Sequence, residues 1–160
     1  MKSVNKLVVL LFMSFTMFVL FVSAITVLFC KNTIAGNLTD NGNGTVTDNV
    51  TGLVWQQEDT DTKYTWEEAM TCCEDTLTLA GYSDWRLPSR EELVSIVDYD
   101  TFNPSIDSTT FPNTNISYHW SSATSANNTS YAWIVNFYNC YVTYTNKSYN
   151  NYVRCVRDGQ

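Results

Sequence analysis

The chain has one histidine that could act in acid–base chemistry, and it stands beside two serines. His119 precedes Ser121 and Ser122 in a segment of β-prone residues. A serine nucleophile needs a histidine base within hydrogen-bonding distance. Adjacent strand residues face opposite ways, so we interpret His119 as a hydrogen-bonded or solvent-facing residue. We expect no catalytic residue in this chain and no enzymatic activity.

Metal ligands are equally sparse. Asp40, Gly42 and Gly44 fall where a calcium loop needs oxygen ligands at alternate positions, so the calcium pattern is broken and a solvated turn is expected. One histidine, without a cluster of cysteines and carboxylates at ligand spacing, does not support zinc. The sequence therefore predicts no metal and no cofactor.

The N-terminal segment has the pattern of an export signal. Lys2 and Lys6 precede an apolar run over residues 7–29, which is long enough to cross a bilayer as a helix. Cleavage after Ala24 or Ala35, an uncleaved anchor, and a lipid on Cys30 are the alternatives. We expect a signal peptide or membrane anchor at residues 1–36 and one folded domain at residues 37–160, located outside the cytoplasm.

The charge of the expected domain limits its partners. Removing residues 1–36 takes away three lysines and no acid, which leaves six basic and sixteen acidic side chains and a net charge of −10. Nucleic acid is therefore not an expected partner. Contact with a membrane is expected only through the N-terminal segment, if it stays uncleaved.

Two capping signatures predict two helices. Thr65 followed by Glu68 starts a helix that should end near Gly81, and Ser89 followed by Glu92 starts another that should stop by Asp100. Cys73 belongs to the apolar stripe of the first helix. An exported chain meets oxidising conditions, and the four cysteines of the expected domain allow three pairings: Cys72, Cys73, Cys140 and Cys155.

The remaining segments have the pattern of β-strands. A hairpin is predicted over residues 41–57. Four strands follow over residues 118–121, 131–137, 141–145 and 152–157, and we expect them to form one antiparallel sheet. Trp120 and the alternating Trp133, Val135 and Phe137 are assigned to the core. Two helices followed by a run of strands indicate an α+β fold.

The C-terminal third has the composition of a binding surface. Seven of the ten tyrosines and seven asparagines lie between residues 117 and 152, where Lys147 is the only fully charged side chain. Tyrosine supplies a large amphipathic contact area with few torsions to freeze, and asparagine adapts its hydrogen bonds to many partners. The ligand-binding residues that we predict are Tyr118, His119, Asn127, Asn128, Tyr131, Tyr138, Asn139, Tyr141, Tyr144, Asn146, Tyr149 and Asn150.

Four strings of residues resemble one protein family. They are GYSDWRLPSREELVSIVDY (81–99), DNGNGTVTDNVTGLVW (40–55), HWSSATSANNTSYAWIVNF (119–137) and the closing YVRCVRDGQ. Together they resemble the Lcl C-terminal domain family, named after a bacterial collagen-like adhesin. The resemblance implies a C-type-lectin-like or formylglycine-generating-enzyme-like fold, with two helices packed on antiparallel sheet and an N-terminal hairpin. It also implies a disulfide between the first helix and the last strand, which here joins Cys73 to Cys155.

Two cysteines depart from the family pattern. Cys72 stands where an aromatic residue is usual, and Cys140 where glycine is usual. A bond between them, two free thiols and intermolecular pairing all remain open. We favour two incidental thiols.

The resemblance and the composition together imply an exported binding or adhesion module that recognises a protein or glycan ligand at the cell surface. Lectin-like folds are also targets of diversity-generating retroelements, which change adenines in asparagine-type codons. Cys140 in a glycine position fits such diversification. The alternatives are an enzyme of the formylglycine-generating class that uses Cys140, and a structural protein of the cell envelope.

Overall fold

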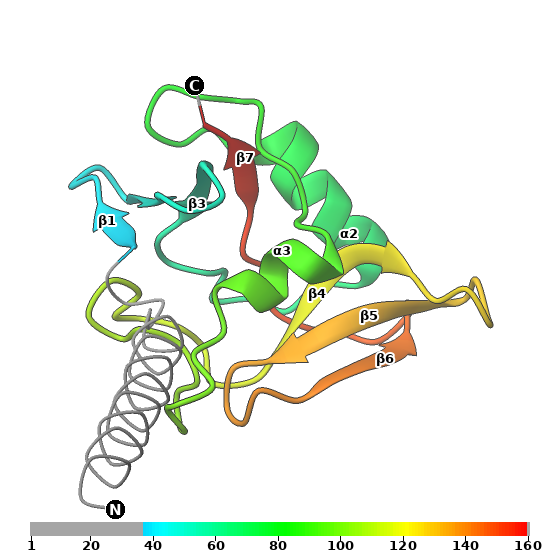
Figure 1. Cartoon of the computed structure of the whole chain (residues 1–160). Helices are drawn as coiled ribbons and strands as arrows, with labels where there is room; N and C mark the ends of the chain where they lie inside the picture. The colour runs from blue at the N-terminus through cyan, green and yellow to red at the C-terminus, as the bar shows by residue number, and fades with distance from the viewer. Residues whose placement is uncertain (1–36, 160) are drawn as a thin grey trace, which may run out of the picture. The chain divides into compact units, whose positions relative to one another are not determined.

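Two antiparallel sheets organise residues 37–159, the part of the chain that this computed structural model describes (Figure 1). The predicted signal peptide or anchor lies outside the described residues. One sheet has the order β1–β2–β3–β7 and the other the order β4–β5–β6. The strands are β1 (Leu38–Asp40), β2 (Thr45–Asp48), β3 (Leu53–Gln56), β4 (Tyr118–Thr124), β5 (Tyr131–Asn136), β6 (Val142–Asn146) and β7 (Val156–Asp158).

The predicted N-terminal hairpin is confirmed as β2 and β3. Val46 pairs with Trp55 across it, and both side chains are fully buried. The turn is held by Asp48, whose carboxylate accepts hydrogen bonds from the backbone N–H of Val50 and the hydroxyl of Thr51. Such side-chain bonds to a following turn are typical of aspartate.

Both predicted helix starts are confirmed. The backbone N–H of Thr65 donates to the Glu68 carboxylate over 2.9 Å at the start of α2 (Trp66–Thr71). At the start of α3 (Arg90–Ser95), the backbone N–H of Glu92 donates to the Ser89 hydroxyl over 3.1 Å. The first helix ends earlier than the expected Gly81, because α2 runs into a π-helical turn, η2 (Cys72–Thr76), after which the backbone is extended.

The α+β class is confirmed, but the expectation of a single sheet is wrong. Tyr152 makes an isolated parallel bridge to His119 beside β4, whereas β7 pairs antiparallel with β3. The chain crosses from one sheet to the other over residues 153–155, where Val153, Arg154 and Cys155 are buried. The last predicted strand is therefore divided between two sheets.

Strand β5 is buried on both faces, because a hydrophobic cluster lies on each side of the β4–β5–β6 sheet. Val135 and the following Phe137 join α3 and the β2–β3–β7 strands in one cluster. Ala132 and Ile134 join Trp120, Trp85 and the residues around the disulfide in the other. Trp120 is fully buried as predicted.

The expected disulfide is present. Cys73, from η2, is bonded to Cys155, and both side chains are buried in the second cluster. Cys72 and Cys140 are bonded to no other cysteine of the described residues. A Cys72–Cys140 bond is therefore not formed in this structure.

Candidate binding surface

The single histidine is not part of an exposed surface. His119 is fully buried, and its Nε2 lies 2.6 Å from a carboxylate oxygen of Asp59. A ligand on the surface cannot reach this side chain, so the inclusion of His119 among the predicted ligand-binding residues is wrong. The sequence did not indicate this pairing because Asp59 precedes His119 by 60 residues.

A buried polar network surrounds this pair. A guanidinium N–H of Arg154 points to Asp59 over 3.4 Å, and another donates to the backbone carbonyl of Gln56 over 2.8 Å. The backbone N–H of Asn115 donates to the same carboxylate over 2.9 Å. The network thus joins the loop after β3, the loop before β4 and the crossing segment before β7.

The ionisation of the network follows from its burial and its charges. Burial lowers the pKa of His119 below its usual value. Burial alone would raise the pKa of Asp59, but the hydrogen bond from His119, the charge of Arg154 and the hydrogen bond from Asn115 hold it below its usual range. Burial lowers the pKa of Arg154 to about 10, so it stays charged at neutral pH. An ionised carboxylate only accepts hydrogen bonds, so neutral His119 donates through Nε2.

The predicted tyrosines and asparagines do not form one face, because the strands carry them to opposite ends of the β4–β5–β6 sheet. The β5–β6 turn holds exposed Tyr138, Asn139 and Tyr141. The opposite end holds the β4–β5 loop, the start of β5, the end of β6 and the loop that follows it; the predicted residues there are Asn127, Asn128, Tyr131, Asn146, Tyr149 and Asn150. Tyr118 is half-buried and packs against the second hydrophobic cluster.

At the β5–β6 turn, the structure adds two aromatic residues that sequence reasoning missed. Tyr99 and Phe102 are the most exposed, each at 63%, beside Tyr138 at 40% and Tyr141 at 56%. The rings of Phe102 and Tyr138 meet edge to face at 4.6 Å between centroids. We call these four residues the turn patch. Their segments lie far apart in the sequence, so no local pattern indicated the grouping.

A second aromatic group, here called the strand cluster, lies on β5 and β6. The ring of Tyr144 meets that of Trp133 at 5.4 Å and that of Tyr131 at 5.9 Å. The guanidinium of Arg90 lies 4.6 Å from the centre of the Trp133 ring. Trp133 is only half-buried, so its assignment to the core is wrong: near the start of β5, α3 covers the sheet with the charged side chain of Arg90 and not with apolar residues.

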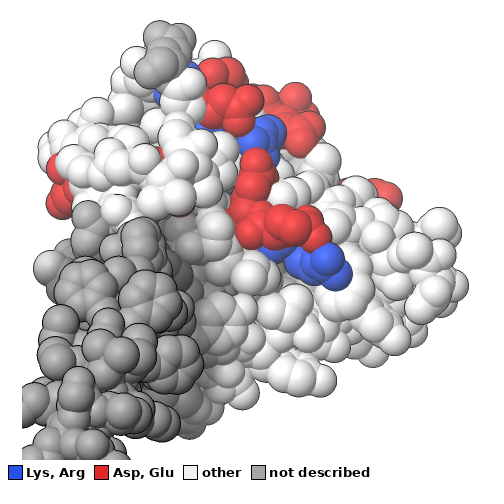
Figure 2. Space-filling view, viewed as in Figure 1, with Lys and Arg blue, Asp and Glu red and all other residues white. Residues whose placement is uncertain are grey.

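Charge is unevenly distributed over the surface. Figure 2 shows acidic and basic side chains gathered over α3 and the upper part of the view, whereas the surface over β5 and β6 is almost free of charge. A polar pocket of about 520 Å³ lies beside this surface, where the β4–β5 loop and the end of β6 meet the start of α2. Of the predicted residues, Asn146 lines it.

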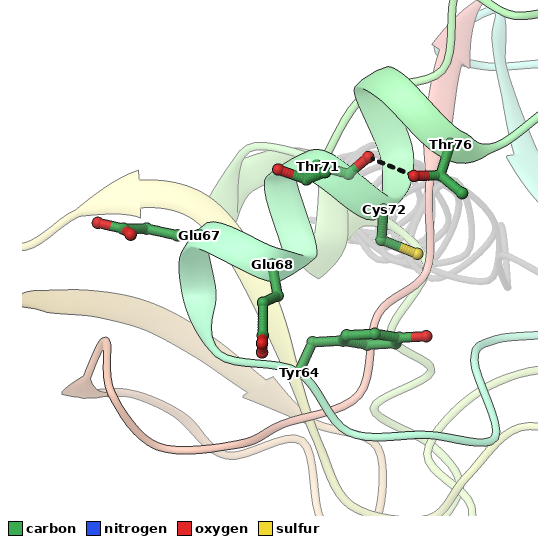
Figure 3. A pocket seen from close by; sticks show the side chains of 6 residues that line it. All are labelled: Tyr64, Glu67, Glu68, Thr71, Cys72 and Thr76. Atoms are coloured by element: carbon green, nitrogen blue, oxygen red, sulfur yellow. Dashed lines mark hydrogen bonds between the residues drawn. The ribbon is translucent and has the colours of Figure 1, made fainter.

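A further pocket of about 390 Å³ lies along α2 and η2. Figure 3 shows the side chains of Glu68 and Cys72 pointing to the same side of the helix, toward Tyr64, and that of Glu67 pointing elsewhere. Burial raises the pKa of the Cys72 thiol, so the reactive thiolate is disfavoured at neutral pH. This thiol therefore has the environment of a packing residue.

Neither a metal site nor a membrane-spanning helix is found among residues 37–159. No group of three or more histidine, cysteine, aspartate or glutamate side chains is placed to hold a metal ion there. No helix in the same range is long and apolar enough to cross a membrane.

Comparison with known families gives one match to this chain. The sequence model of the Lcl C-terminal domain matches residues 44–157, which span the hairpin, both helices and β4 to β7. No curated protein matches the chain. The matched region covers most of the sequence, and the chain therefore belongs to the Lcl C-terminal domain family.

Proposed function

We propose that this chain is a non-catalytic binding module of an exported protein, and that it attaches to a protein or glycan at the cell surface. The observation that carries the proposal is the exposure of Tyr138 and Tyr141 at the β5–β6 turn and of Tyr144 on β6. Exposed tyrosines on a fixed backbone give contact area at low entropic cost. Membership of a family named after an adhesin supports the same function.

The rigidity of the scaffold also supports binding. The Cys73–Cys155 bond and the buried Asp59–His119–Arg154 network tie the last residues of the chain to distant segments. A surface held in place before it meets a ligand loses less conformational entropy on binding.

The test is an array of surface proteins and glycans probed with the purified chain. The triple variant Tyr138→Ala, Tyr141→Ala and Tyr144→Ala should lose the ligands that the unmodified chain captures. A control with Val50→Ala and Thr78→Ala, both exposed outside this surface, should keep them. Unchanged attachment of the triple variant would instead favour a structural role in the cell envelope.

An enzyme of the formylglycine-generating class that uses Cys140 is the competing function. The Cys140 thiol is half-buried and lies 3.6 Å from the backbone carbonyl of Asp98, which supports a packing role. The variant Cys140→Ser separates the two functions: a binding module keeps its ligand, whereas the enzyme loses its turnover.

Diversification by a retroelement, on a C-type-lectin-like fold, is the finer form of this proposal. The backbone of Cys140 has a φ of 61°, a left-handed conformation that glycine adopts freely and other residues seldom do. A cysteine in such a position is expected where the codon, rather than the fold, selects the residue. A genome without a near-copy template that differs chiefly at adenines would remove this part of the proposal.

Export itself is tested separately. A phosphatase that is active only outside the cytoplasm, fused after residue 160, should be active in cells that express the full chain. An inactive reporter on a stable fusion would place the domain inside and contradict the proposed location.

A further inference from the structure

We propose that the turn patch docks a protein segment that presents arginine or lysine beside apolar residues. This inference rests on the proposed binding function and names the partner for one end of the sheet. It is carried by four exposed aromatic rings, by the carboxylates in the same loop, and by the absence of any cation stacked on these rings from residues 37–159.

The patch is built on a fixed backbone. The N–H of Asn103 donates to the carbonyl of Tyr138 over 3.0 Å, and that of Ser105 donates to the carbonyl of Phe137 over 2.7 Å. The Cys140 thiol adds a contact to the carbonyl of Asp98. The loop of residues 98–105 is thereby joined to the β5–β6 turn, and the segments that carry the four rings are held together before any partner arrives.

Four exposed aromatic rings lie on two joined segments. Tyr99, Phe102, Tyr138 and Tyr141 are each between 40% and 63% exposed, although they come from only two segments. Apolar groups that gather on a surface in this way mark interaction sites. The faces of tyrosine and phenylalanine rings also attract cations, most of all guanidinium.

The acidic side chains beside the turn patch favour a positively charged partner. Asp98 and Asp100 flank Tyr99 in the loop, and residues 98–105 and 136–142 contain no lysine or arginine. An anionic ligand would meet repulsion here, and a neutral one would gain only hydrogen bonds from the carboxylates. A cationic segment gains from both the carboxylates and the rings.

Five aromatic rings elsewhere in the described part of the chain have a cation over them. Lysine or arginine side chains of the described residues lie over Trp66, Tyr82, Phe111, Trp133 and Tyr152. No such contact is formed at the turn patch within the same part of the chain. The rings of the turn patch therefore remain available to a cation from another molecule.

The experiment measures binding of short peptides to the full chain, purified in the form that cells export and immobilised for biolayer interferometry. The probe is the acetylated, amidated hexapeptide Gly-Arg-Leu-Arg-Leu-Gly, compared with matched peptides in which glutamine or glutamate replaces both arginines. The arginine peptide should bind about tenfold more tightly than the glutamine peptide. The glutamate peptide should bind most weakly.

Matched variants locate the site. Phe102→Ala with Tyr138→Ala should abolish the preference for arginine, and Asp98→Asn with Asp100→Asn should weaken it about two- to fivefold per carboxylate. Asparagine keeps the side-chain oxygen that accepts from the Asp100 N–H. Glu74→Gln with Asp75→Asn, exposed acids on η2, is the control for nonspecific attraction.

Three results would overturn the inference: equal binding of the arginine and glutamine peptides, an equal loss in the η2 control, or no effect of the aromatic variants. Tyr99→Ala is a second aromatic variant, since its ring is largely exposed and its loss should leave the fold intact. If the peptides fail but the array ligand is still lost in the tyrosine triple variant, the proposed function stands and only the cationic partner is wrong.

Discussion

Removal of the Cys73–Cys155 bond should destabilise the domain strongly. The two cysteines are 82 residues apart in the sequence, and the chain-entropy relation values the closure of such a loop at about 4.5 kcal/mol at 25 °C. That amount is comparable with the whole stability of many domains. The measurement is urea unfolding followed by tryptophan fluorescence, with and without a reductant.

The measurement is made on a variant that lacks the other two thiols of the domain. With Cys72→Ser and Cys140→Ser, exchange between neighbouring sulfurs cannot replace the bond. For a urea dependence of about 1.5 kcal/mol per molar, reduction should lower the unfolding midpoint by about 3 M. A shift below about 1 M would refute the reasoning, because the unfolded chain would then not be constrained by this crosslink.

Three other predictions concern the buried network and the β5–β6 turn. The pKa of His119 in the folded state lies below the usual 6.5, so on acidification the unfolded chain binds this proton before the folded chain does. The free energy of unfolding should therefore fall as the pH drops below 6.5. In His119→Gln, the midpoint of urea unfolding should change less between about pH 5 and 7 than in the unmodified chain. Asp59→Asn should cost about 3 to 5 kcal/mol in urea unfolding, since Arg154 stays buried without its carboxylate; a loss below about 1 kcal/mol would contradict this. Cys140→Gly should be about 1 kcal/mol more stable than Cys140→Ala, because only glycine relieves the positive φ, and equal melting temperatures would count against it.

Local signals in the sequence predicted the starts of elements well. A capping box involves residues three positions apart, so Thr65 with Glu68 and Ser89 with Glu92 were sufficient to place two helix starts. The end of the first helix was misplaced because the π-helical turn η2 has no comparable signature. The hairpin of β2 and β3 could also be predicted, because its strands and turn follow one another directly in the sequence.

Long-range contacts explain the remaining differences. Arg154 and Cys155 bind partners far away in the sequence, and these contacts take the chain from one sheet to the other between Tyr152 and β7. Strand periodicity misplaced Trp133 because it predicts the face on which a residue lies, but not how far along the strand the apolar cover of that face extends. The turn patch depends on hydrogen bonds between the backbones of two loops, and a pattern of side chains in the sequence cannot predict such bonds.

The position of β7 makes residues 155–158 a condition for completion of the fold. This strand pairs with β3 on one side, and Val156 also forms a bridge with Arg86 on the other. Without residues 155–158, one edge of β3 has no partner and Cys73 has no sulfur to join. A nascent or truncated chain that ends before residue 155 is thus left with open strand edges, which other polypeptides can pair with.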